Sequence, residues 1–194
     1  MKSDAKKMSA KTLALGAILT ALVIVLQFMG SFIKLGMFSV SLVLIPIVIG
    51  AAMCGKYIGA WLGFVFGVIV LISGDAAAFL AVNIPGTVVT VLLKGTLCGL
   101  CAGLVYDLFA KKNQYLGVFA AAIVCPIVNT GIFLLGCLVF FMPTISGWAG
   151  DANVNVVTFM IFGLGLINFP IELAFNLVLS PVIVRLLNIS KRLG

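Results

Sequence analysis

The sequence predicts an all-α integral membrane protein with six transmembrane helices and both chain termini in the cytoplasm. Of its 194 residues, 63% are hydrophobic and only 9% are charged, whereas a soluble domain carries roughly 25% charged residues. Its mean hydropathy is +1.34. Its apolar runs approach the length of about 20 residues that crosses a bilayer. We therefore expect one membrane domain over residues 1–194, with little chain left for a soluble one.

Six apolar segments qualify, or nearly qualify, as spanning helices. They cover residues 12–29, 40–54, 57–73, 87–109, 115–142 and 156–187. The first segment follows a lysine-rich stretch but is too long for the apolar part of a signal peptide, so we expect a retained helix. The second is short. The last two are long and contain prolines, which predicts tilting, kinking or protrusion from the bilayer.

Basic residues lie almost entirely on one side of this arrangement. With a cytoplasmic N-terminus, the inner side receives Lys2, Lys6, Lys7, Lys11, Lys56, Lys111, Lys112, Arg185, Lys191 and Arg192. The outer side receives only Lys34. Short cytoplasmic loops are enriched in lysine and arginine, so this asymmetry sets the orientation. It also explains the net charge of +7 without a nucleic-acid-binding surface.

The loops on the outer side are longer than those on the inner side. They cover residues 30–39, 74–86 and 143–155. Two interpretations stay open: these loops cover an outward-facing pocket, or they simply connect helices.

Small residues recur at four-residue spacing in three segments. They are Ala17 and Ala21 in the first, Gly59, Gly63 and Gly67 in the third, and Gly95, Gly99 and Gly103 in the fourth. Residues at this spacing share one helical face, and small side chains let membrane helices approach closely. The glycine stripes are expected to build the bundle. The alanine face either does the same or contacts a partner protein.

Polar side chains are rare within the apolar segments. They are Gln27, Lys94, Asn129, Asn168, Glu172 and Asn176. Counted from the inner helix ends at 1.5 Å per residue, Lys94, Asn129 and Glu172 each lie about 21–22 Å up. Asn168 lies one turn further out. These four residues are therefore expected to share a layer in the outer half of the bilayer.

Ionisable groups at membrane depth are candidates for a functional site. One interpretation is a small polar pocket in which Lys94 binds a ligand carboxylate or phosphate, and Glu172 accepts from a ligand hydroxyl or amide. The alternatives are a structural ion pair between Lys94 and Glu172, or a lysine that extends its stem toward the membrane surface.

The sequence offers little for catalysis. It has no histidine, and its five cysteines all fall in apolar segments, where free cysteine packs as a small hydrophobe. Cys98 and Cys101 form a CxxC without further ligands, so no metal site and no cofactor are expected. A GxxxxGK[ST] phosphate loop is missing as well. We expect a protein that is not an enzyme and does not itself hydrolyse ATP.

The order of these motifs resembles the substrate-binding S subunits of energy-coupling factor (ECF) vitamin transporters. Similar stretches are ALGAILTAL, IPIVIGAAMCGKYIGAWLGFVFG, VTVLLKGTLCGLCAGLVYDLF, CPIVNTGIFLLG and NFPIELAFNLVLSPVIVRLL. Together they cover nearly the whole chain.

The resemblance implies a high-affinity binding subunit in a bacterial cell membrane. Such subunits bind a water-soluble vitamin at the outer side and dock on a transmembrane T subunit driven by two cytoplasmic ATPases. It implies that Ala17 and Ala21 contact the T subunit, and that Lys94, Asn129, Asn168 and Glu172 bind the vitamin. The chain lacks the aromatic-rich signature expected of a thiamine binder. It matches a pantothenate- and riboflavin-like branch better, and a pocket lysine suits an anionic ligand such as pantothenate.

Two other functions remain open at this point. A solitary secondary transporter is expected to show paired inverted repeats with broken helices, and no convincing repeat is visible. A structural membrane protein would bind no ligand.

Overall fold

The computed structural model describes residues 10–31, 34–35, 38–39, 42–165 and 169–192, and over these residues the fold is helical apart from one short hairpin. The elements in order are α1 (Ala10–Ser31), β1 (Lys34–Leu35), β2 (Phe38–Ser39), α2 (Leu44–Cys54), α3 (Lys56–Ile72), α4 (Ala77–Leu80), α5 (Ile84–Phe109), α6 (Gln114–Phe140), α7 (Met142–Asp151), α8 (Val156–Thr158), the π-helix η1 (Phe159–Gly165) and α9 (Phe169–Arg192). The two strands pair in an antiparallel register.

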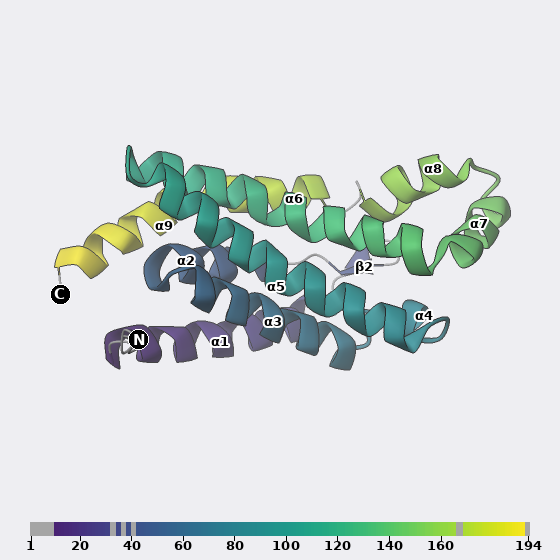
Figure 1. The fold of residues 1–194 in the computed structure, drawn as a ribbon, viewed down its shortest axis with the longest axis horizontal. Coiled ribbons are helices and arrows are strands. Elements are labelled where there is room, and N and C mark those ends of the chain that lie inside the picture. The colour runs from purple at the N-terminus through teal and green to yellow at the C-terminus, as the bar shows by residue number, and fades with distance from the viewer. Residues whose placement is uncertain (1–9, 32–33, 36–37, 40–41, 166–168, 193–194) are drawn as a thin grey trace, which may run out of the picture.

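The long helices run side by side along one axis (Figure 1). The start of α1 and the end of α9 lie at one end of the bundle, with the α2–α3 and α5–α6 turns. The short helices α4, α7 and α8 gather at the opposite end. We call these the terminal end and the capped end.

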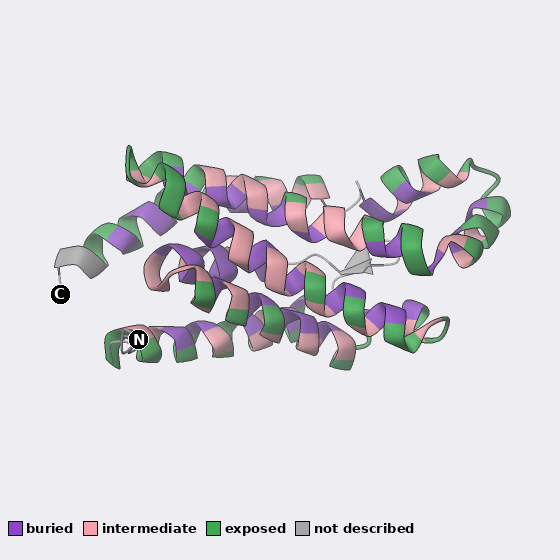
Figure 2. Ribbon diagram, in the orientation of Figure 1, coloured by how far each residue is buried: buried purple, intermediate pink, exposed green. Residues whose placement is uncertain are grey.

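The helix lengths and compositions define an all-α membrane protein. Three single helices are long and apolar enough to cross a bilayer, α1, α5 and α6, as is the segment Val156–Ile189. The apolar helices α2 and α3 are shorter, with 11 and 17 residues. Many large apolar residues are exposed, as expected for a surface that faces lipid. Figure 2 shows exposed residues along all the long helices.

The two glycine stripes pack against each other in the contact between α3 and α5. A Cβ on Gly63 would collide with the carbonyl oxygen of Gly95, and a Cβ on Gly95 would meet that of Gly63. Gly59 and Gly99 face each other in the same way. The backbones of the two helices thus touch directly, because neither stripe has side chains to keep them apart.

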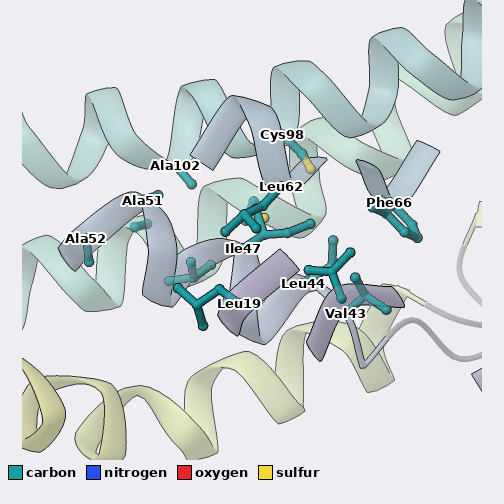
Figure 3. Close-up of a cluster of buried hydrophobic side chains, with 14 of the residues drawn as sticks. Leu19, Val43, Leu44, Ile47, Ala51, Ala52, Leu62, Phe66, Cys98 and Ala102 are labelled. Atoms are coloured by element: carbon teal, nitrogen blue, oxygen red, sulfur yellow. The ribbon is translucent and has the colours of Figure 1, made fainter. Parts of the chain in front are cut away.

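The larger apolar core joins residues of α1, α2, α3, α5, α6 and α9. Leu19 of α1, Ile47 of α2, Leu62 of α3 and Cys98 of α5 meet there (Figure 3), and the last three are fully buried. The buried face of α1 therefore points into the bundle. Its other face stays outside.

The helix boundaries differ from the sequence prediction at the capped end. The predicted helix over 156–187 is not one α-helix, because residues 159–165 form a π-helix and a new α-helix starts at Phe169. Pro170 fits the first turn of that new helix, where its missing N–H is not needed. The predicted loops 74–86 and 143–155 contain α4 and most of α7, and Pro143 stands at the start of α7.

Candidate functional site

A pocket lies between the helices in the half of the bundle nearest the capped end. It holds about 740 Å³ of space free of protein atoms, part of it open to solvent. The part of it that the centre of a water-sized molecule can reach is about 70 Å³. The walls come from α1, α3, α4, α5, α6, η1 and α9, with the turn before α4.

Lys94 of α5 brings a positive charge to this pocket. The side chain is half-buried, and its Nζ lies 5.5 Å from the ring centroid of Phe66 and 5.4 Å from that of Phe133. Both distances are within the range of cation–π attraction. The ammonium is therefore stabilised by aromatic faces from α3 and α6.

Asn129 of α6 and Glu172 of α9 also line the pocket. Each side chain is only 5% exposed. The Asn129 Oδ1 atom has no hydrogen-bond partner within the described part of the chain, and a buried polar atom without a partner is costly. The Glu172 carboxylate attracts the Lys94 ammonium electrostatically. Three of the four predicted site residues thus share one cavity. The fourth, Asn168, lies outside the described residues.

The pocket has a second polar region that involves α1. The Gln27 side chain is 1% exposed, and its Nε2 donates a hydrogen bond of 2.5 Å to the Asp75 carboxylate, next to α4. Thr90 of α5 is also buried against the pocket, and its hydroxyl has no partner among the residues described. A ligand bound in the pocket would lie close to the Gln27–Asp75 pair and to the Thr90 hydroxyl.

Aromatic rings close the pocket toward the capped end. Phe79 of α4 packs edge-on against Phe133, Phe141 and Trp148, with centroid distances of 5.6, 5.0 and 5.6 Å. Edge-to-face packing in this distance range is favourable. The three phenylalanines line the pocket, and Trp148 joins them from α7. Within the described residues, the predicted loop 74–86 thus lines the pocket through Asp75, Ala76 and Phe79. The loop 143–155 reaches this aromatic cluster through the contact of Trp148 with Phe79.

The sequence prediction missed several residues of this site. It placed the pocket mainly in the last three spanning segments, whereas α1 and α3 also contribute, through Gln27 and Phe66. Gln27 carries a signal in the sequence, because an amide within an apolar segment is rare. The phenylalanines carry none, since aromatic side chains also face lipid.

The alanine face of α1 lies on the outside of the bundle. Ala17 and Ala21 are exposed, whereas Gly16 and Leu19, on another face of α1, are buried. A shallow groove beside Ala17 runs between α1 and α3 and reaches Trp61. Both alanines are thus exposed, and Ala17 lines this groove. Docking of a partner there stays a prediction.

The residues described include no group of three or more histidine, cysteine, aspartate or glutamate side chains suited to a metal ion. The pocket instead combines one ammonium, two carboxylates, amides and hydroxyls with apolar walls. Such a site can bind a small polar molecule and orient it, which is the design of a binding protein.

The comparisons with known proteins agree with this class. Residues 11–184 match the family described as ECF transporter, substrate-specific component. A solved structure entitled "Native-SAD phasing for ThiT from Listeria monocytogenes serovar" has a similar fold, with a TM-score of 0.66 and 20% sequence identity. The similarity covers 94% of this chain and 96% of that chain. A comparison with curated proteins gives no match.

The family match covers most of the chain, so this protein belongs to the ECF transporter substrate-specific components. These are multi-pass membrane proteins without catalytic activity of their own. They bind a substrate and associate with the ECF T and ATPase subunits. The family assignment favours a substrate-binding transport subunit over the other two functions that the sequence left open, a solitary secondary transporter and a structural membrane protein.

Proposed function

We propose that this chain binds a small water-soluble vitamin in the pocket around Lys94 for ATP-driven uptake, and that the vitamin is pantothenate or riboflavin. The observation that carries the proposal is the convergence of Lys94 and the buried Asn129 side chain in one pocket with aromatic walls. A few placed polar groups within apolar walls are typical of small-molecule sites.

Pantothenate matches the polar groups of the pocket. The Lys94 ammonium has three donors and no acceptor, so it suits a carboxylate. The Asn129 Oδ1 and Thr90 Oγ1 atoms, which lack partners among the described residues, can accept from the amide and hydroxyl groups of this vitamin. The binding of such a ligand would satisfy buried atoms that otherwise cost free energy.

Riboflavin is the second candidate, and the aromatic walls favour it. Phe66, Phe79 and Phe133 all line the pocket. A flat heteroaromatic ring can stack on, or pack edge-to-face against, such side chains. Lys94 would then donate to a ring carbonyl, and the amides would bind the polar chain of the vitamin.

The proposal includes the orientation and the partners of the subunit. We place six spans across the membrane with both termini in the cytoplasm, because basic residues concentrate near the terminal end. The pocket then opens near the outer surface. The exposed face with Ala17 and Ala21 docks on the T subunit, and two ATPases supply the energy.

Ligand binding by the purified protein tests the proposal. We would measure thermal stabilisation in detergent with pantothenate, riboflavin and thiamine, and then the dissociation constant by calorimetry. Lys94→Ala is expected to weaken binding at least about tenfold, as for loss of a charge-assisted contact. Lys111→Ala, at an exposed lysine beyond α5, serves as the matched control.

Two results would contradict the proposal. Stabilisation by thiamine alone would exclude both proposed vitamins. Unchanged affinity of Lys94→Ala together with lost stability would show that Lys94 is the structural partner of Glu172 and does not contact the ligand.

A further inference from the structure

We propose that Phe66 and Phe133 are positioning residues for Lys94. They hold its ammonium at a fixed place in the pocket and thereby set the preference for a negatively charged ligand over an uncharged analogue. This inference rests on the proposed function, because it concerns the same pocket and assumes that Lys94 contacts the ligand.

The geometry places the ammonium between rings from two helices. Its Nζ lies 5.5 Å from the ring centroid of Phe66 on α3 and 5.4 Å from that of Phe133 on α6. Lys94 itself belongs to α5. Three helices therefore meet at this one charge, and a shift of any of them would move it relative to the pocket walls.

A lysine needs such support because its stem is flexible. The side chain has a four-carbon stem with rotatable bonds, and ordering it costs rotamer entropy. Aromatic faces attract the ammonium through their quadrupole and do not need a hydrogen bond from each of its N–H groups. The rings can thus hold the charge while leaving its hydrogen-bond donors available to a ligand.

Each ring is itself held in place by separate contacts. Phe66 is fully buried in the larger core. It belongs to α3, which is packed closely against α5 through its glycines. Phe133 packs edge-on against Phe79, with a centroid distance of 5.6 Å and an interplanar angle of 84°. The two rings therefore have packing contacts that do not depend on the lysine.

The charges around the pocket explain why the place of the ammonium matters. Two carboxylates line the pocket, Asp75 and Glu172, against one ammonium among the described lining residues. Both carboxylates repel an anionic ligand. The Glu172 carboxylate also attracts the ammonium, so the attraction of the two rings opposes a shift of the ammonium toward Glu172.

The test compares binding of pantothenate with binding of panthenol, its uncharged alcohol analogue. In Phe133→Leu the preference for pantothenate is expected to fall about three- to tenfold, the size of a partly desolvated cation–π contact. Phe133→Tyr keeps an aromatic face and should keep the preference. Phe141→Leu is the matched control, because this phenylalanine lines the same pocket and its ring packs against Phe79; it should weaken both ligands about equally.

Lys94→Met separates this inference from the proposed function. If the unmodified protein binds neither pantothenate nor riboflavin, the proposed function fails. If pantothenate binds and Lys94→Met leaves its affinity unchanged, Lys94 is not a ligand contact, and the positioning role fails with it. If Lys94→Met weakens pantothenate but Phe133→Leu leaves the preference intact, only the positioning role fails. Loss of the preference in Phe133→Leu, with recovery in Phe133→Tyr, supports it.

A measurement without ligand completes the test, should pantothenate not bind. The unfolding temperatures of Lys94→Met, Phe133→Leu and the double variant form a cycle. The double variant should lose clearly less stability than the sum of the two single variants, because the first substitution already removes the contact. Additive losses, within the error of the measurement, would overturn the positioning role.

Discussion

The backbone contact between α3 and α5 leaves no room for a side chain at Gly63. We predict that Gly63→Ala destabilises the protein. The added Cβ would collide with the carbonyl oxygen of Gly95, which is backbone and cannot rotate away. The two helices would have to separate, and the aromatic side of α3 would move relative to Lys94.

The magnitude follows from two opposing effects. Overpacking costs typically about 1–3 kcal/mol, and a clash with backbone belongs at the upper end. Replacing glycine by alanine in a helix returns up to about 1 kcal/mol. We therefore expect a net loss of about 2 kcal/mol, which lowers the unfolding temperature by about 4–8 °C for a chain of this size.

Gly131→Ala is the matched control. Gly131 also lies within a long helix, α6, but a Cβ there would have no neighbour within 4 Å. Its unfolding temperature should stay the same or rise. Thermal unfolding of both variants in the same detergent measures the difference. Equal unfolding temperatures for the two variants would refute the idea that direct backbone contact holds α3 against α5.

Two further predictions concern α1. The double variant Ala17→Leu, Ala21→Leu should still bind the vitamin but should assemble poorly with the T subunit in co-purification, because bulky side chains prevent close approach. The control Ala174→Leu, at an exposed alanine of α9, should assemble normally. Equal assembly of the double variant and the control would contradict the docking role. Gln27→Leu removes the hydrogen bond to Asp75 and should lower the free energy of unfolding by about 1–3 kcal/mol, since it leaves the Asp75 carboxylate without that donor. The unfolding temperature measures this loss. An unchanged unfolding temperature would show that the hydrogen bond makes no net contribution to stability.

The polar residues show how far reasoning from the sequence reaches. Counting residues from the inner helix ends placed Lys94, Asn129 and Glu172 at one level, and the structure brings all three to one pocket. Counting works here because the rise of an α-helix is constant and the helices run along a common axis. The count assumes an α-helical rise, which the π-helix at residues 159–165 does not have.

The small residues show the limit of the same reasoning. Their spacing predicted helix faces that allow close approach, but it did not predict which helix packs against each face. Only the structure pairs Gly63 with Gly95 and leaves Ala17 outside the bundle.

The sequence by itself determined the class of this protein, because the length of apolar runs and the placement of charges follow directly from the thickness and charge asymmetry of a membrane. The tertiary structure decided the composition of the pocket. Phe66 and Phe133 look like ordinary lipid-facing residues in the sequence, since hydrocarbon and protein interior are equally apolar for them. Only helix packing turns these two rings toward Lys94.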